Sequence, residues 1–210
     1  MIVVNFKNYK IGKEVLDLVR TIDIYCNKAI VAVPSTELME ISKEVSMPVY
    51  AQSIDLPEKG RGTGKLIPDE ILSTGAKGSI INHSENKLPF STIKKIVERS
   101  NEIGLKLIIC AATLKEAEKI KKLSPYSIAF EDPKLIASGK SITKVKTSSV
   151  KKFVDLLKGT EIIPLCGAGI STSEDVAQAI LLGCKGVLVS SVVADSQHPE
   201  QFLKQVAGML

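Results

Sequence analysis

The sequence predicts an α/β protein that forms a single domain over residues 1–210 and folds as a closed (β/α)8 barrel. Short runs rich in Val and Ile alternate with amphipathic helical patterns, at about 26 residues per unit. No linker rich in Pro, Gly or Ser divides the chain, which is long enough for one sizeable core. An open doubly wound sheet is the competing arrangement, but eight such units favour closure because a barrel leaves no strand edge exposed.

The expected strands are nearly continuous apolar runs, which suit strands that are covered on both faces. A usual barrel of this kind has about 250 residues, so this shorter chain must have short helices and trimmed loops. The strands are expected at residues 2–6, 29–33, 48–52, 79–82, 105–110, 126–130, 161–165 and 186–190.

The segments between these strands place apolar residues three and four apart, which predicts helices that cover the sheet. Pro89 is placed to open one of them, and Ser171 and Glu174 have the spacing of a capping box at the start of another. His198 precedes Pro199 and is expected to lie at a helix entry. The helices are expected at 12–25, 35–45, 66–74, 89–103, 114–123, 146–158, 171–183 and 199–209.

Composition excludes several classes of function. The chain is 44% hydrophobic and carries a net charge of +5, but only 4% of its residues are aromatic, too few for base-stacking platforms, so no nucleic-acid role is expected. No apolar run is long enough to cross a membrane and the start does not resemble a signal peptide, which favours a cytoplasmic protein. The four cysteines form no CxxC pair and are expected to be buried, reduced thiols, with no metal site. No GxGxxG follows the first strand, which argues against a dinucleotide site.

Polar side chains collect where strands end, which is where barrels carry their chemistry. Asn5 and Lys7 follow the first strand, His83 the fourth and Glu131 the sixth. Taken singly, Lys7 is equally well the first solvent residue after its strand, and Glu131 is more often a helix cap or a surface charge. Together they place an ammonium, an imidazole and a carboxylate around one barrel mouth.

The loops after the seventh and eighth strands are built from small residues, Gly167-Ala168-Gly169 and Ser190-Ser191. Small residues let backbone N–H groups approach an anion closely, and these two loops often form a phosphate site in barrels. Turn geometry alone is the other explanation for the glycines. Residues 133–140 have the composition of a mobile lid.

Six motifs run in order over about 190 residues, and they are NFKNY (5–9), AQSIDLPEKGRGTGKLIPDEIL (51–72), NHSEN (82–86), AFEDPKLIASGK (129–140), CGAGI (166–170) and LVSSVV (188–193). Together they resemble the triosephosphate isomerase family, whose fold is the TIM barrel, and they look closest to its short archaeal form. The resemblance implies reversible interconversion of dihydroxyacetone phosphate and glyceraldehyde 3-phosphate through an enediolate, a step of glycolysis and gluconeogenesis. It implies neither a metal nor an organic cofactor.

The roles of the polar residues come from the resemblance and are not worked out from spacing. Glu131 is expected to be the general base, and His83 a neutral hydrogen-bond donor whose charge state is set by a nearby helix N-terminus. Lys7 supplies positive charge, Asn5 orients it and the substrate, and Glu85 interacts with Lys7. Backbone N–H groups are expected to hold the phosphate at Ala137, Ser138, Gly167, Ala168, Gly169, Ser190 and Ser191.

The resemblance also implies a homodimer or a homotetramer. In the family the tip of the third loop, here Thr63-Gly64, inserts beside the first-strand lysine of a neighbouring subunit. One departure concerns Asp132, which stands where many members have proline and is expected either to loosen the hinge of the lid or to shift the pKa of Glu131.

Two other functions remain open at this point. One is a different phosphate-binding barrel isomerase, of amino-acid biosynthesis. The other is a non-catalytic phosphate-binding relative.

Overall fold

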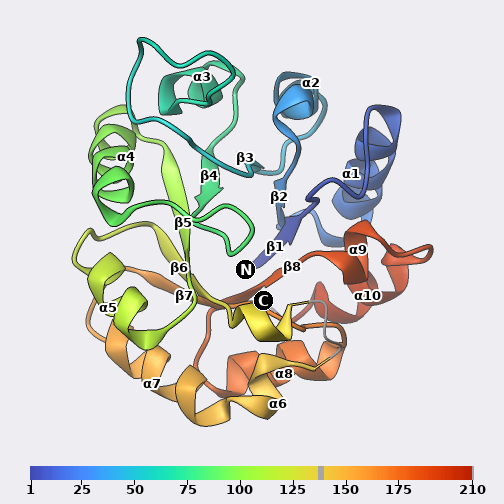
Figure 1. Cartoon of the computed structure of the whole chain (residues 1–210). Coiled ribbons are helices and arrows are strands. Elements are labelled where there is room, and N and C mark those ends of the chain that lie inside the picture. Colours follow the sequence, from blue (N-terminus) through green and yellow to red (C-terminus); the bar gives the residue numbers. More distant parts are fainter. Residues whose placement is uncertain (137–139, 210) are drawn as a thin grey trace.

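Parallel strands close into a barrel in chain order, from β1 to β8, in the computed structural model (Figure 1). The structure describes residues 1–136 and 140–209. Strand β1 pairs with β8 through Val3 and Leu188, which closes the ring. The expected strands are confirmed, with ends that shift by one or two residues. They are β1 (Ile2–Asn5), β2 (Ile30–Ala32), β3 (Val49–Ala51), β4 (Gly78–Ile81), β5 (Lys106–Ala111), β6 (Ser127–Phe130), β7 (Ile163–Cys166) and β8 (Gly186–Val189).

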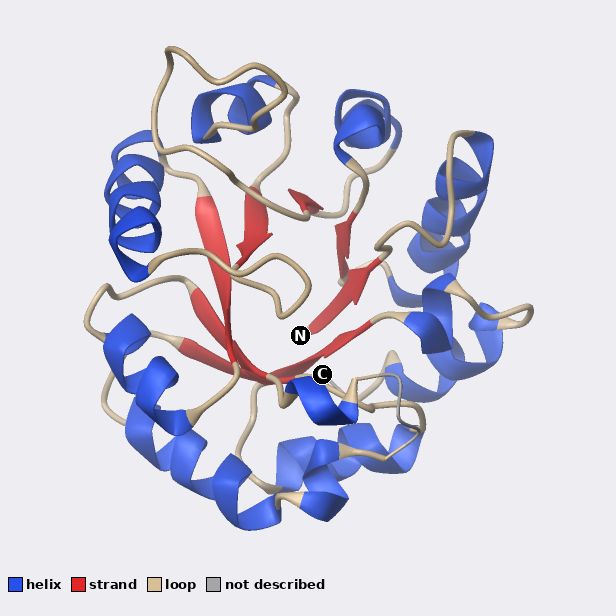
Figure 2. Cartoon of the chain, viewed as in Figure 1, coloured by secondary structure: helices blue, strands red, loops and turns tan. Residues whose placement is uncertain are grey.

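Helices surround the barrel and cover its outer face (Figure 2). The expected helical segments are confirmed as α1 (Lys13–Cys26), η1 (Ser35–Glu37) with α2 (Leu38–Glu44), α3 (Pro68–Ser73), α4 (Phe90–Ile103), α5 (Leu114–Lys121), α7 (Thr147–Leu157), α8 (Ser173–Leu181) and α10 (Pro199–Val206). His198 lies at the entry of α10, as expected. Three short turns were not expected, because they are too short to show a helical period, and they are η2 (Pro133–Leu135), α6 (Ile142–Val145) and α9 (Ser191–Ala194). In the part of the chain that the structure describes, no helix has the length and apolar character needed to cross a membrane.

The N-cap of α8 differs from the prediction by one residue. Thr172, not Ser171, caps the helix, because its side chain accepts a hydrogen bond from the backbone N–H of Asp175. Asp175 completes the capping box, not Glu174, since its carboxylate accepts from the N–H of Thr172. The same carboxylate accepts from the N–H of Ser171, which therefore stays outside the helix in the loop that follows β7.

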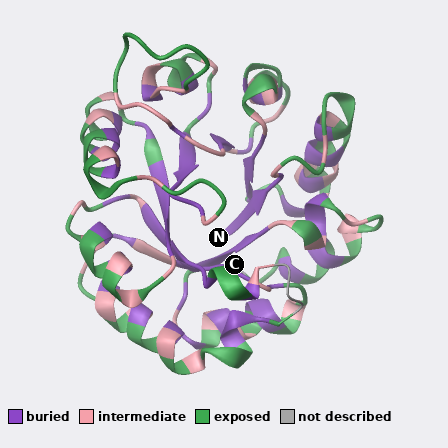
Figure 3. Ribbon diagram, viewed as in Figure 1, coloured by how far each residue is buried: buried purple, intermediate pink, exposed green. Residues whose placement is uncertain are grey.

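Two apolar layers hold the barrel together, one inside it and one between strands and helices. Figure 3 shows the strands as buried and the outer helix faces as exposed. The inner layer is filled by side chains such as Tyr50, whose ring occupies the room beside Gly78: a Cβ on Gly78 would lie 2.4 Å from that ring. A filled interior leaves the carboxyl ends of the strands as the place where polar side chains can gather.

Candidate active site

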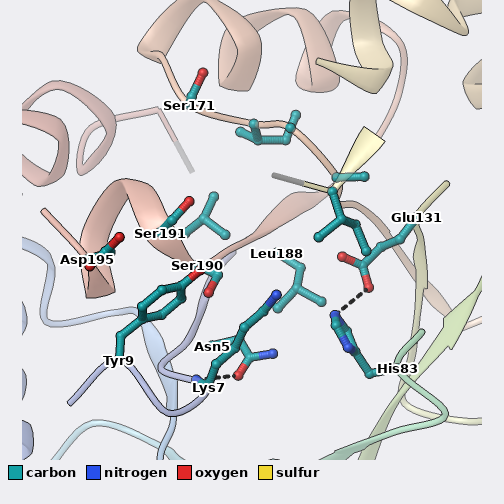
Figure 4. A pocket seen from close by; sticks show the side chains of 15 residues that line it. Asn5, Lys7, Tyr9, His83, Glu131, Ser171, Leu188, Ser190, Ser191 and Asp195 are labelled. Atoms are coloured by element: carbon teal, nitrogen blue, oxygen red, sulfur yellow. Dashed lines mark hydrogen bonds and ion pairs between the residues drawn. The ribbon is translucent and has the colours of Figure 1, made fainter. Parts of the chain in front are cut away.

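A pocket of about 330 Å³ opens at the carboxyl ends of the strands. It brings together four polar residues that the sequence placed at strand ends: Asn5, Lys7, His83 and Glu131. They come from the ends of β1, β4 and β6, and Figure 4 shows their side chains directed into a common space. The loops after β7 and β8 complete the lining, which includes Ala168, Gly169, Ser190 and Ser191.

Glu131 lies directly after β6 and is buried. Its backbone N–H donates to the carbonyl of Ala111 at 3.0 Å, which continues the ladder with β5 and fixes the direction of the side chain. The carboxylate oxygen Oε2 lies 3.7 Å from Nε2 of His83 and has no hydrogen-bond partner among the residues that the structure describes. A buried carboxylate oxygen without a partner costs free energy, so its retention at a pocket indicates a functional group.

Gly167 gives the Glu131 side chain its space. A Cβ on Gly167 would lie 2.5 Å from Oε1 of Glu131 and 2.6 Å from its Cγ. Gly167 does not line the pocket itself but sits behind the carboxylate. The small residue after β7 therefore serves the carboxylate as well as the loop.

The imidazole of His83 is buried and oriented by its own loop. The backbone N–H of Glu85 donates to Nδ1 at 3.3 Å, and the N–H of Asn86 donates to the carbonyl of His83 at 2.9 Å. Because Nδ1 accepts a hydrogen bond, this contact assigns the ring proton to Nε2, so a neutral imidazole presents an N–H donor to the pocket.

A contact within its own loop accounts for that neutral state. A turn follows His83, and the next helix along the chain, α4, begins at Phe90. The hydrogen bond from a backbone N–H, not a helix N-terminus, sets the tautomer. The carboxylate of Glu85 lies 3.6 Å from Nδ1, too far for a hydrogen bond.

Lys7 sits in a left-handed backbone conformation, with φ +47°, just beyond β1. Its N–H donates to Oδ1 of Asn5 at 3.0 Å, and its carbonyl accepts from Nε2 of Gln52 at 3.0 Å. These two contacts hold a conformation that non-glycine residues seldom adopt. The ammonium forms an ion pair with Oε1 of Glu85 at 2.7 Å, so the expected contact of these two residues is present. Glu85 itself does not line the pocket.

The loop after β7 is tied to the chain that follows the lid segment. Ala168 and Gly169 both have positive φ, +70° and +72°, and the carbonyl of Ala168 accepts from the N–H of Ile142 at 3.2 Å. A Cβ on Gly169 would lie 2.1 Å from the carbonyl oxygen of Lys140, so only glycine fits there. In the loop after β8, the buried Oγ of Ser190 has no hydrogen-bond partner within residues 1–136 and 140–209.

Asp132 fastens the start of the lid segment, where the sequence led us to expect a looser hinge. Its carboxylate accepts from the N–H of Lys134 at 2.9 Å and thereby caps η2. It also forms an ion pair with Lys146, at the junction of α6 and α7. The hydrogen bond from Lys146 is the main cause that lowers the pKa of Asp132. Ala137 and Ser138, two of the expected phosphate contacts, lie outside the described residues.

The cysteines are buried and free, as expected from their spacing. Burial, followed by the nearby Glu131 carboxylate, raises the pKa of the Cys110 thiol. A thiol kept protonated in this way packs near the Glu131 carboxylate and is a poor nucleophile. In the described part of the chain, no three His, Cys, Asp or Glu side chains are grouped so as to hold a metal ion.

Sequence reasoning missed several residues of the pocket. Tyr9 lies two residues beyond Lys7, within the same motif, so its position was open to inference. Asp195 follows α9, a turn that has no signal in the sequence. Thr63 is exposed, in the loop between β3 and α3, and does not line the pocket. The remaining unexpected lining residues are Ile136, Ile170, Ser171, Leu188 and Val189.

Comparison with known proteins agrees with this architecture. The family model described as triosephosphate isomerase matches residues 1–207. The triosephosphate isomerase of Sulfurisphaera tokodaii is 35% identical over 211 residues, which cover 97% of this chain and 92% of that protein. That of Archaeoglobus fulgidus is 35% identical, with 100% and 98% covered, and that of Methanothermus fervidus is 36% identical, with 98% and 96% covered. With a closed barrel, a polar mouth and this match along nearly its whole length, the chain belongs to the triosephosphate isomerase family.

Proposed function

We propose that this protein is a triosephosphate isomerase, which interconverts dihydroxyacetone phosphate and D-glyceraldehyde 3-phosphate. The observation that carries the proposal is the pair formed by Glu131 and His83. A buried carboxylate oxygen without a partner in the described chain stands opposite an N–H donor, 3.7 Å away, at the floor of one pocket. The family and the names of its relatives support the same reaction.

The reaction moves one proton between two adjacent carbons. The Glu131 carboxylate takes the proton from the carbon next to the carbonyl, and the electron pair of the C–H bond moves onto the carbonyl oxygen to give an enediolate. The Nε2–H of His83 donates a hydrogen bond to the oxygens on which this charge develops, and the ammonium of Lys7 adds positive charge. The proton of the neighbouring hydroxyl passes to the former carbonyl oxygen, so that the hydroxyl oxygen becomes the new carbonyl oxygen. Protonated Glu131 returns its proton to the former carbonyl carbon, and the carboxylate is restored.

The phosphate of the substrate is assigned to the small-residue loops. Ala168, Gly169, Ser190 and Ser191 line the pocket, and Gly167 precedes the first two in the chain. Their size supports close approach of an anion to backbone N–H groups, and Ala137 and Ser138 are proposed to join them. Residues 133–140 are proposed to cover the enediolate, since water would favour the elimination of phosphate.

We also propose one domain over residues 1–210, a cytoplasmic location, and assembly as a homodimer or homotetramer. The pairing of β1 with β8 supports a single domain, because it joins both ends of the chain in one sheet. The exposed Thr63 and the exposed Ile11, in the loop after β1, support self-association through the third loop. Sedimentation at micromolar concentration tests the assembly, and a monomer there would contradict it.

The first test is a coupled assay. The purified protein receives glyceraldehyde 3-phosphate, and a dehydrogenase that oxidises reduced nicotinamide reports dihydroxyacetone phosphate. Removal of a general base costs about 10²–10⁴-fold, so Glu131→Gln is expected to lower kcat at least 10²-fold. Glu118→Gln, on the exposed face of α5, is the matched control and is expected to keep parental turnover.

Two outcomes would contradict the proposal in different ways. Full turnover by Glu131→Gln would show that Glu131 is not the base. No turnover by the folded parent, together with tight binding of phosphoglycolate, would indicate a phosphate-binding relative without catalysis.

A further inference from the structure

Asn82, the residue before His83, has a left-handed backbone and is almost fully buried. Its φ is +59° and its exposure is 2%. Asparagine tolerates this conformation better than most residues, although at a cost that the surroundings must offset. Because β4 ends at Ile81, Asn82 is the point at which the chain turns out of the strand. Its conformation therefore decides where the imidazole of His83 points.

The side chain of Asn82 uses both of its polar ends. Its Nδ2 donates to the carbonyl of Cys110 at 2.8 Å and to Oε1 of Glu116 at 2.8 Å. Its Oδ1 accepts from the N–H of Leu88 at 3.1 Å. The first contact joins Asn82 to β5, and the last joins it to the far end of its own loop. Of the three contacts, the one with Glu116 is the only one in which the partner is a charged side chain.

Glu116 gathers donors from two neighbouring loops. It lies in the first turn of α5, and its Oε2 accepts from the N–H of Ala112 at 2.8 Å, in the loop after β5. Its Oε1 accepts from Asn82 and is paired with the ammonium of Lys87, both in the loop after β4. Burial raises the pKa of Glu116, but the hydrogen bonds from Lys87, Ala112 and Asn82 outweigh it, and the net shift is downward. The ionised carboxylate therefore accepts from three donors, which belong to Asn82, Lys87 and Ala112.

Glu116 does not touch the pocket. The lining residues include His83 but neither Glu116 nor Asn82, so any effect of Glu116 on the reaction must pass through the loop after β4. This path is short, because Asn82 is bonded to Glu116 at one end and peptide-bonded to His83 at the other. The turn that follows is fixed as well, since Lys87 is held to the same carboxylate.

We propose that Glu116 is a positioning residue for the isomerisation, which holds Asn82 and so aims Nε2 of His83 at the substrate oxygens. The inference rests on the role of His83 in the proposed function. Charge-assisted hydrogen bonds are stronger than neutral ones, which suits Glu116 to hold a conformation that Asn82 would otherwise leave. An offset of about 1 Å at a catalytic group lowers turnover by about 10²-fold, so modest release of this loop is enough to matter.

The test compares Glu116→Ala and Asn82→Gly with the control Glu118→Ala. Asn82→Gly allows positive φ but removes all three hydrogen bonds, so it separates the role of the side chain from that of the backbone. Both test variants are expected to lower kcat by about 10-fold to 10²-fold, while KM and phosphoglycolate affinity change by less than about threefold. Glu118→Ala is expected to match the parent, because Glu118 is exposed on the same helix.

A second readout reports the imidazole directly. The chain has two histidines, so ¹⁵N-labelled histidine gives two sets of ring signals, and His198→Gln identifies those of His83. The parent is expected to show the Nε2–H tautomer, and Glu116→Ala a mixture of tautomers, in protein that circular dichroism shows to be folded. This measurement needs no turnover, so it tests the positioning even if the proposed reaction fails.

Two results would overturn the inference. One is a folded Glu116→Ala variant whose kcat stays within about twofold of the parent. A change that small is far less than the loss expected when a catalytic group is misplaced. The other is an unchanged ¹⁵N pattern for His83 in that variant. A fall in melting temperature alone, with kcat and the ring signals unchanged, would assign Glu116 a purely structural role.

Discussion

The carboxylate of Glu131 faces the imidazole of His83 across the floor of the pocket, with Oε2 3.7 Å from Nε2 (Figure 4). This distance is longer than a hydrogen bond, so the two groups do not bond to each other and both stay available to a substrate. Both side chains are buried, and each presents a polar atom to the same small volume. A substrate with a C–H bond next to a carbonyl can meet the base and the donor at once, which is what abstraction of a weakly acidic proton requires.

Replacement of His83 by glutamine is expected to lower kcat more than it raises KM. Glutamine keeps an N–H donor but loses the ring that the N–H of Glu85 holds in place through Nδ1. Removal of one oxyanion donor costs about 10²–10³ in kcat, so a loss of about 10²-fold is expected in steady-state assays. His198→Gln, at the entry of α10, serves as the control. A His83→Gln variant with more than about a tenth of parental kcat would remove His83 from the mechanism.

Gly167→Ala is expected to impair turnover while the barrel stays folded. The added Cβ would lie 2.5 Å from Oε1 of Glu131, so the carboxylate must swing away from its present place. Because the obstructed atoms belong to the Glu131 side chain and not to the backbone, melting temperature is expected to change less than turnover, and kcat is expected to fall by roughly 10²-fold. Gly208→Ala, where a Cβ meets nothing within 4 Å, is the control. Parental kcat in folded Gly167→Ala would show that the position of the carboxylate is not critical.

The barrel and its polar mouth were predictable from the sequence, because both depend on the order of strands and helices along the chain. Apolar runs of strand length repeat along the chain, and the closed ring preserves their order, so Asn5, Lys7, His83 and Glu131 fall at strand ends that must meet. Glu116 was not predictable in this way. It lies on a helix face, and its partners Asn82 and Lys87 are distant in sequence. From the sequence, Lys87 is indistinguishable from an ordinary exposed lysine.

The wrong expectations share a different cause. The capping box shifted by one residue because Ser171 and Thr172 are equivalent in pattern, and only the contacts of Asp175 distinguish them. The hydrogen bond that orients the His83 ring was not predictable either, because the turn after His83 and the left-handed Asn82 leave no periodic signal. Choices among neighbouring residues depend on three-dimensional hydrogen bonds, which single-sequence patterns do not contain.

Lys7→Met is expected to weaken binding of a phosphate anion, because it removes the ammonium and leaves the charge of Glu85 uncompensated near the pocket. The double variant Lys7→Met/Glu85→Gln is expected to recover part of the affinity, since it removes that remaining negative charge. Titration with phosphoglycolate at low and high salt measures both effects, and the difference between variants is expected to shrink at high salt. Lys13→Met, exposed at the start of α1, is the control. Equal affinity for Lys7→Met and the parent at low salt would show that Lys7 does not act on the anion.

Asp132→Asn is expected to make folding less sensitive to acid. The ion pair with Lys146, the hydrogen bond from the N–H of Lys134 and the charges of both lysines lower the pKa of Asp132 in the folded protein, against a smaller opposing effect of burial. A carboxyl whose folded-state pKa lies below its unfolded value of about 3.9 stabilises the fold above that pH. This contribution is lost as the pH falls through the lower, folded-state pKa.

Urea unfolding at pH 7 and near pH 2 tests the sign of this effect. At pH 7 the Asn variant is expected to be less stable than the parent by on the order of 1 kcal/mol, a modest value because Lys146 is half-exposed. As the pH is lowered through the folded-state pKa of Asp132 and the parent carboxyl becomes protonated, the two free energies of unfolding are expected to converge. Asp155→Asn is the control, because Asp155 forms an exposed ion pair with Lys158 at the end of α7. Its loss of free energy of unfolding at pH 7 is expected to be smaller. The neutral Asn side chain can still accept the hydrogen bond from the N–H of Lys134. An equal loss of stability at both pH values would therefore show that the substitution distorted this hydrogen bond. It would contradict the prediction that the charge of Asp132 stabilises the segment.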